Sequence, residues 1–143
     1  MYIRDVLTKN RAPISTEPTT PVSRAMEFMV SNDIGSLVVM KSGEMVGLIT
    51  ERDIIHSLSK SGCAVLEGPV ADIMTLEPII GGLDDSIDYA RDVMTRYRVS
   101  HIPVMDGNTL IGVISFHDVA KACLKEAKFE NNLLKRYIKH WPE

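Results

Sequence analysis

Hydrophobic and polar residues follow the same order twice along this chain. Apolar residues recur every three or four positions in residues 22–30 and again in residues 87–94, which predicts two amphipathic helices. Two short apolar runs joined by a polar turn follow each helix, at residues 36–40 and 45–49 in the first case and at residues 101–105 and 110–114 in the second. Each half of the pattern therefore predicts a helix followed by a β-hairpin.

Shorter signals precede each helix. A short helical segment and a short extended segment are expected in each half, at residues 3–8 and 13–16 and at residues 70–75 and 78–81. Thr20 is expected to cap the first amphipathic helix and Pro21 to begin it, as these residue types do at helix starts. Gly62, Gly68 and Pro69 mark the join between the halves.

The two halves are copies of one unit. Residues 22–55 align without a gap on residues 87–120, an offset of 65 positions, and the identical pairs are Ala25/Ala90, Met29/Met94, Val39/Val104, Met40/Met105, Gly47/Gly112, Ile49/Ile114 and Asp53/Asp118. A shared register of this length indicates an internal repeat. One strand-helix-strand-strand-helix unit is too small to bury both faces of its sheet, so we expect the two copies to pack together and share one core.

A strand-to-helix corner recurs at residues 47–54 and 112–119. In each copy a hydroxyl residue, Thr50 or Ser115, ends an apolar strand, and a carboxylate, Asp53 or Asp118, follows three positions later. This spacing matches a capping box, in which the hydroxyl caps the helix and the acid reaches back, and that explanation is purely structural. The same acid can instead accept hydrogen bonds from both hydroxyls of a ribose, while the helix N-terminus favours phosphate. Both interpretations remain open at this point.

The corner sequence of Gly, two apolar residues, Thr or Ser, two variable residues and Asp resembles the cystathionine-β-synthase (CBS) domain family. The resemblance covers about residues 1–122. It implies an α/β (α+β) fold of two pseudo-symmetric β-α-β-β-α repeats packed together, with an extended C-terminal helix. The expected divisions are repeat 1 at residues 1–62, repeat 2 at residues 63–122, and a helical tail at residues 123–143.

The resemblance also implies two ligand sites, each combining the corner of one repeat with strands of the other. The first would contain Thr50, Arg52, Asp53, Ile79, Ile80, His101, Ile102 and Pro103. The second would contain Ser15, Thr16, Ser36, Leu37, Val38, Ser115, His117 and Asp118. The implied ligand is an adenine nucleotide (AMP, ADP or ATP), with S-adenosylmethionine and NAD(H) as further candidates, and no cofactor is required. Arg52 and His101 suggest that the first site prefers the more charged ligand.

The last predicted helix extends beyond the end of the second repeat. It begins near Asp118 and extends toward Trp141, and its apolar face comprises Phe129, Leu133, Leu134, Tyr137 and Ile138. Such a face is covered either by its own domain or by a second chain. We expect a homodimer packed through its helices.

Composition excludes several classes of partner. The chain has 143 residues, of which 45% are hydrophobic and 24% charged, and a formal net charge of -3, which argues against binding nucleic acid or anionic membranes. No run approaches the roughly 18 apolar residues of a membrane span, and the first residues lack an apolar signal core. The expected location is cytoplasmic. Cys63 and Cys123 indicate neither a disulfide framework nor a zinc site.

No catalytic pattern accompanies these features. The four histidines lack partners at metal-ligand spacing, and neither a Walker nor a Rossmann glycine pattern occurs. The chain is therefore expected not to be an enzyme. It is expected to sense an adenosyl ligand and to transmit occupancy to an unidentified protein partner. The alternative is a structural homodimerisation module whose nucleotide sites are vestigial.

Overall fold

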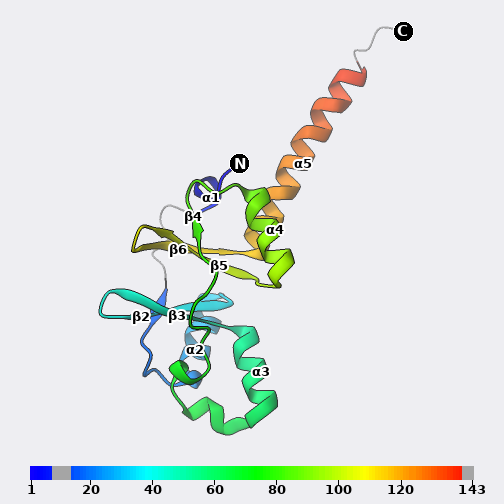
Figure 1. Ribbon diagram of the computed structural model, residues 1–143. Coiled ribbons are helices and arrows are strands. Elements are labelled where there is room, and N and C mark those ends of the chain that lie inside the picture. The colour runs from blue at the N-terminus through cyan, green and yellow to red at the C-terminus, as the bar shows by residue number, and fades with distance from the viewer. Residues whose placement is uncertain (8–13, 140–143) are drawn as a thin grey trace.

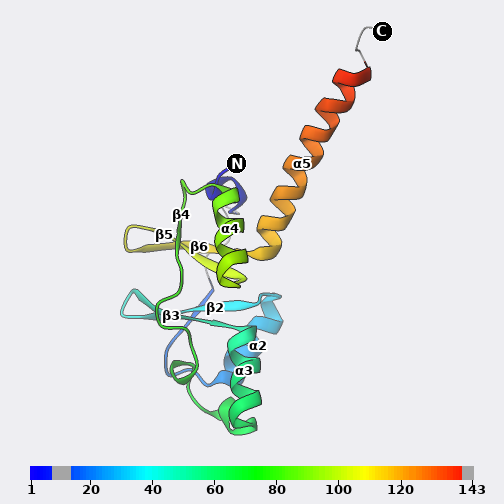
Figure 2. The same ribbon diagram turned by 45° about the vertical axis from the view of Figure 1, so that its right-hand side comes forward.

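Two similar halves, each a small sheet with helices, lie one above the other, and a long helix projects from the second half (Figures 1 and 2). The computed structural model describes residues 1–7 and 14–139. In chain order the elements are α1 (Ile3–Val6), β1 (Ser15–Thr16), α2 (Val22–Asn32), β2 (Ser36–Lys41), β3 (Glu44–Thr50), α3 (Glu51–Ser61), the 3-10 turns η1 (Cys63–Glu67) and η2 (Val70–Asp72), β4 (Gly81–Gly82), α4 (Ile87–Tyr97), β5 (His101–Asp106), β6 (Thr109–Ser115) and α5 (Phe116–Lys139). The predicted α/β repeat with an extended C-terminal helix is confirmed.

The two sheets have the same topology. Strand β1 is parallel to β2 and β2 is antiparallel to β3, and β4, β5 and β6 repeat this arrangement. Ser36 pairs with Thr50, and His101 pairs with Ser115. This register places the first residue of each hairpin opposite the hydroxyl residue at the corner.

The first hairpin closes more tightly than the sequence suggested. The strands extend to Lys41 and Glu44, which leaves Ser42 and Gly43 as the turn. Both have positive φ, 52° and 81°, as a two-residue type I′ turn requires.

Each half is completed by a segment from the other repeat. Ile3 is fully buried in the core of the second half, where its amide donates to Asp85 O at 2.9 Å. Val70 is likewise buried in the core of the first half, and its amide donates to Thr20 O at 2.8 Å. The expectation of one shared core is wrong: the described residues form two core clusters, because the exchanged segments cover each sheet separately. The division of the sequence at residue 62 stays a prediction.

Several local predictions are shifted or wrong. Helix α2 is capped by the backbone of Pro21, not by Thr20, whose carbonyl and hydroxyl are engaged by Val70 and Thr16. The second extended segment forms its strand at residues 81–82, three residues later than expected. Val30 continues the apolar pattern of residues 22–30, but its side chain is 82% exposed. The predicted features at Thr8, Pro13 and Trp141 lie outside the described residues.

Candidate functional site

Both corners form complete capping boxes. At the first, the Thr50 hydroxyl accepts from the Asp53 amide at 3.2 Å, and Asp53 Oδ2 accepts from the Thr50 amide at 2.9 Å. At the second, the corresponding Ser115 and Asp118 distances are 3.1 and 3.0 Å. The structural interpretation of these residues is therefore confirmed. The cap does not prevent Asp118 from also binding a ligand. The cap uses Oδ2, and Oδ1 has no hydrogen-bond partner among residues 1–7 and 14–139.

A cleft of about 1,210 Å³ opens at the second corner, between the two halves. Its walls come from α1, from the segment before β2, from the start of α3 and from β6 with the first turn of α5. The lining residues are Arg4, Asp5, Val6, Leu7, Ile14, Asp33, Ile34, Gly35, Ser36, Glu51, Leu83, His101, Ile111, Gly112, Val113, Ser115, His117 and Asp118. Its volume exceeds the few hundred Å³ of a small ligand pocket, so the cleft has room for a nucleoside with a substituent.

His101 lies where the two halves meet. A Cβ added to Gly35 would lie 2.9 Å from His101 Cε1, so a larger residue at position 35 would require the His101 ring to shift. Burial lowers the pKa of His101 below its ordinary value, and the nearby carboxylates of Glu51 and Asp118 oppose that shift only in part. The imidazole is therefore held neutral near pH 7, as a hydrogen-bonding group rather than a cation.

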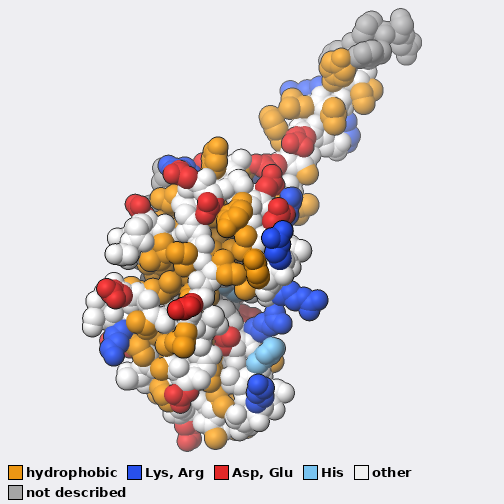
Figure 3. Space-filling view, viewed as in Figure 1, with side chains coloured by type: hydrophobic (Ala, Val, Ile, Leu, Met, Phe, Trp, Pro, Cys, Tyr) orange, Lys and Arg blue, Asp and Glu red, His pale blue; other side chains and the backbone are white. Residues whose placement is uncertain are grey.

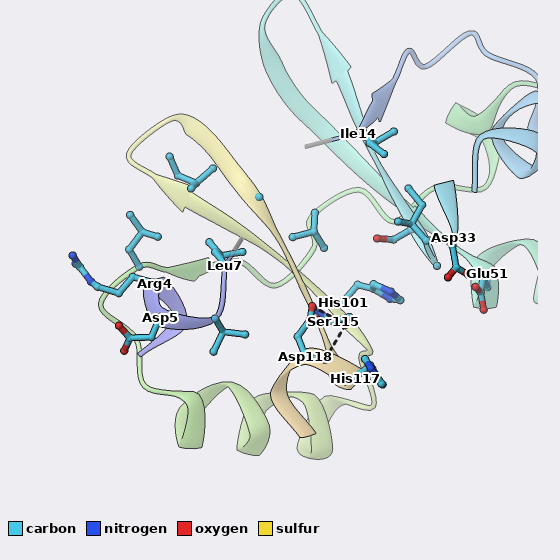
Figure 4. A pocket seen from close by; sticks show the side chains of 18 residues that line it. Arg4, Asp5, Leu7, Ile14, Asp33, Glu51, His101, Ser115, His117 and Asp118 are labelled. Atoms are coloured by element: carbon cyan, nitrogen blue, oxygen red, sulfur yellow. Dashed lines mark hydrogen bonds between the residues drawn. The ribbon is translucent and has the colours of Figure 1, made fainter. Parts of the chain in front are cut away.

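Carboxylates outnumber lysines and arginines among the described residues that line the cleft. Four acidic side chains line it, and they are Asp5, Asp33, Glu51 and Asp118. Among the described lining residues, Arg4 is the one arginine or lysine, and its guanidinium pairs with Asp84. Figure 4 shows His101, Ser115 and Asp118 together, with Asp33 and Glu51 facing them from the first half. The field in this part of the cleft therefore favours a neutral or cationic group over a polyphosphate.

The residues predicted for the second site divide into two groups. Ser36, Ser115, His117 and Asp118 are brought together on the cleft wall. The other four, Ser15, Thr16, Leu37 and Val38, lie on β1 and β2 and are not among the lining residues. Leu37 and Val38 are fully buried, so they support the wall from behind.

Of the residues predicted for the first site, His101 alone is among the described residues that line the cleft. Asp53 accepts a hydrogen bond from the Thr75 hydroxyl at 3.3 Å, and the Arg52 guanidinium donates to Arg98 O at 2.9 Å. Ile79 and Ile80 precede β4, and Ile102 and Pro103 are buried in β5. His101, assigned to this site from the sequence, lies on the wall of the cleft at the second corner. Arg52 and Arg98 leave the first corner the more cationic of the two.

Sequence reasoning missed several residues of the cleft. Asp33, Gly35 and Glu51 correspond by the 65-residue offset to Arg98, Ser100 and Phe116, so the repeat itself gave no signal for them. The residues of α1 were missed because α1 reaches the cleft only by packing against the second half of the molecule, far from it in sequence. A signal existed only for Glu51, which immediately follows the corner hydroxyl Thr50.

Metal-binding clusters and membrane-spanning helices are two further features that could indicate a function. Among residues 1–7 and 14–139, no group of three or more His, Cys, Asp or Glu side chains is arranged to hold a metal ion. Over the same residues, no helix combines the length and the apolar character that crossing a bilayer would need.

Comparison with known proteins agrees with this architecture. The sequence profile of the CBS domain matches residues 3–60 and 70–125. A CBS domain-containing protein of Bacillus subtilis, YhcV, is 26% identical over 118 residues, covering 82% of each chain.

Two solved structures extend the comparison. A CBS-domain-containing protein from Agrobacterium tumefaciens superposes with a TM-score of 0.82 at 30% identity, over 85% of this chain and 98% of that one. The CBS domain pair of protein MJ0100, solved with 5′-methylthioadenosine and S-adenosyl-L-methionine, gives a TM-score of 0.78 at 23% identity, over 88% and 98% of the two chains.

The family assignment rests on agreement between the sequence and the fold. The two profile matches coincide with the two halves of the repeat, and each match ends in the helix that follows a Thr/Ser-x-x-Asp corner. The structural neighbours are pairs of CBS domains with the same arrangement. The chain therefore belongs to the CBS domain family and carries two CBS domains.

Proposed function

We propose that this chain is a regulatory module that binds an adenosine-containing small molecule in the cleft at the Ser115–Asp118 corner. The observation that carries the proposal is Asp118, which caps α5 with Oδ2 and lines the cleft. A carboxylate in this position can accept hydrogen bonds from both ribose hydroxyls through its remaining lone pairs. The Ser115 hydroxyl and the neutral His101 ring add polar groups beside it.

The charge of the cleft narrows the ligand class. The described lining residues include four carboxylates and one paired arginine, and this balance disfavours a triphosphate even though the N-terminus of α5 carries partial positive charge. We therefore favour an adenosyl ligand whose 5′ substituent is neutral or cationic, such as a thioether or a sulfonium. The complex of MJ0100 with two ligands of this kind motivates the choice; at 23% identity, the likeness itself establishes the fold alone. AMP, ADP and ATP fit the first corner better, where Arg52 and Arg98 lie.

Occupancy would be transmitted through the helix that begins at the site. Asp118 lies in the first turn of α5, which continues without interruption to Lys139. A ligand shifts an arrangement only as far as its affinity differs between two states. Since the cleft has walls from both halves, their relative placement is the property that binding would change, and an unidentified protein partner would read it.

Ligand-dependent melting tests the proposal. S-adenosylmethionine, 5′-methylthioadenosine and AMP should raise the melting temperature, and GTP should not, because the adenine edge would be read by backbone groups. Ligand at one hundred times its dissociation constant stabilises a protein by about 2.7 kcal/mol. ATP should displace bound 5′-methylthioadenosine more weakly than AMP does. If ATP is the better competitor, the charge argument is wrong.

A second function is supported by the capping boxes themselves. Because both acids complete a cap, each has a structural role without any ligand. A homodimerisation module with vestigial sites would show no melting shift with any compound of the panel while remaining dimeric.

A further inference from the structure

Helix α5 extends well beyond the domain from which it starts. Its first turns are anchored in the core of the second half by Val119 and Ala122, which are buried. From Leu124 onward, the large apolar side chains are exposed, and Leu124 and Ile138 are 71% and 70% exposed. Figures 1 and 2 show this part of the helix projecting away from both sheets, and Figure 3 shows hydrophobic side chains along it.

One stripe of this helix has the spacing of a coiled coil. The residues alternate at intervals of four and three, and they are Ala120, Leu124, Ala127, Asn131, Leu134 and Ile138. An average spacing of 3.5 keeps such a stripe facing a partner helix. It lies on a different side of α5 from Val119 and Ala122, which face the core. Ala120 is half-buried beside the domain, and from Leu124 onward every residue of the stripe is exposed, so this part faces away from its own fold.

The spacing assigns every position of the heptad. An interval of four follows Ala120, so Ala120, Ala127 and Leu134 occupy the d positions. Leu124, Asn131 and Ile138 occupy the a positions. Phe129 and Leu133 fall outside this seam, at the f and c positions.

The flanking charges decide the orientation of a partner helix. The residue after each d position is a lysine, which places Lys121, Lys128 and Lys135 at the e positions. Glu130 precedes Asn131 and occupies a g position. In a parallel pair, a g residue faces the next e residue of the other chain, so Glu130 would face Lys135 of the second copy. In an antiparallel pair, e residues face one another, and lysine would oppose lysine.

Asn131 points to the same arrangement. It is exposed at the middle of the stripe, between Ala127 and Leu134. A single asparagine at an a position costs stability, but it specifies two strands and their register, because the two amides meet only when the helices are aligned. Apolar residues at every seam position would leave the register less defined.

We propose that α5 pairs with α5 of a second copy as a parallel, in-register, two-stranded coiled coil along the stripe from Ala120 to Ile138. The occupant of the exposed face is thus another copy of this chain. The seam includes no residue of the cleft, so this proposal is independent of ligand binding. In such a pair, the folded domains of both chains lie at the same end of the coiled coil.

Cysteine cross-linking tests the orientation. Ile138→Cys is made in the full chain with Cys63 and Cys123 replaced by serine. Under mild oxidation a parallel pair brings the two substituted positions together and yields a covalent dimer. An antiparallel pair places position 138 opposite the start of the other helix and yields none. Asn132→Cys, on the outer side of the helix, is the matched control and should remain monomeric on a non-reducing gel.

Neighbouring leucines test which face is used. Added to the Ile138→Cys chain, Leu134→Glu should abolish the covalent dimer, whereas Leu133→Glu should preserve it. Circular dichroism confirms that each variant remains folded. The proposal is overturned if folded Ile138→Cys protein gives no covalent dimer, or if Leu133→Glu abolishes the dimer and Leu134→Glu does not.

Discussion

Replacing Asp118 by asparagine separates its role in the helix cap from its role in the cleft. Asp118 Oδ2 accepts from the Ser115 amide at 3.0 Å and from the Ser115 hydroxyl at 2.8 Å. An amide oxygen can accept the same hydrogen bonds, and asparagine is about as good as aspartate at a cap, so folding should lose less than about 1 kcal/mol. The change in the free energy of unfolding is therefore expected to be small.

Ligand affinity should respond much more strongly. Hydrogen bonds to a charged group are each worth about 1.5 to 3 kcal/mol, and the amide replaces one acceptor with a donor. Loss of one such bond to a ribose corresponds to a loss of affinity of about tenfold to about 100-fold. Isothermal titration calorimetry with 5′-methylthioadenosine measures this change, and urea denaturation measures the folding cost on the same variant.

Asp53→Asn is the matched control. Asp53 makes the same cap, at 2.9 and 3.0 Å to the Thr50 amide and hydroxyl, but it does not line the cleft. Both variants should lose similar stability, and only Asp118→Asn should lose affinity for 5′-methylthioadenosine. If the two variants bind equally well, or if Asp53→Asn is the weaker binder, the ligand site has been placed at the wrong corner.

Three further predictions concern the fold. A Cβ at Gly47 would lie 2.6 Å from Met74 Sδ and 3.0 Å from Thr75 O, so Gly47→Ala should destabilise the protein by about 1 to 3 kcal/mol. A Cβ at the equivalent Gly112 would meet the end of the Leu7 side chain at 3.2 Å, so Gly112→Ala should cost less. Urea denaturation of both variants measures the difference. Ile3→Ala should cost about 2 to 5 kcal/mol and lower hydrogen-exchange protection in residues 87–122 more than in the first half, because Ile3 is buried in the second core; equal loss in both halves would contradict the exchange of segments. Burial lowers the pKa of His101 in the folded protein, so below the ordinary value of 6.5 the unfolded chain binds more protons than the folded one. The free energy of unfolding should therefore fall as the pH falls through that region, and His101→Gln should make this dependence less steep. An unchanged slope in the variant would show that other groups cause it.

Local patterns were enough to predict the elements of the fold. The hairpins, the amphipathic helices and the caps at Thr50 and Ser115 depend on neighbouring residues, and each occurs where the sequence places it. Resemblance between the halves then predicted the pseudo-symmetric arrangement. The cap of α2 was misplaced because Thr20 is engaged by Val70, a contact across 50 positions of sequence that no local pattern reports.

The residues that line the cleft were harder to predict from the sequence than the strand-to-helix corner beside them. Symmetry between the repeats suggested two related sites, and Arg52 indicated from the sequence that they would differ in charge. His101 was assigned to the first corner, but it lines the cleft at the second, because the β5–β6 register pairs it with Ser115. Such differences arise where the halves meet, and they depend on side chains that the repeat does not share.

Crystals of the protein grown with 5′-methylthioadenosine give the most direct test of the ligand site. The account predicts electron density in the cleft between the halves, with both ribose hydroxyls within hydrogen-bond distance of the Asp118 carboxylate and the 5′ substituent among the acidic side chains. Density only at the Thr50–Asp53 corner, or a cleft that stays empty at saturating ligand, would contradict it.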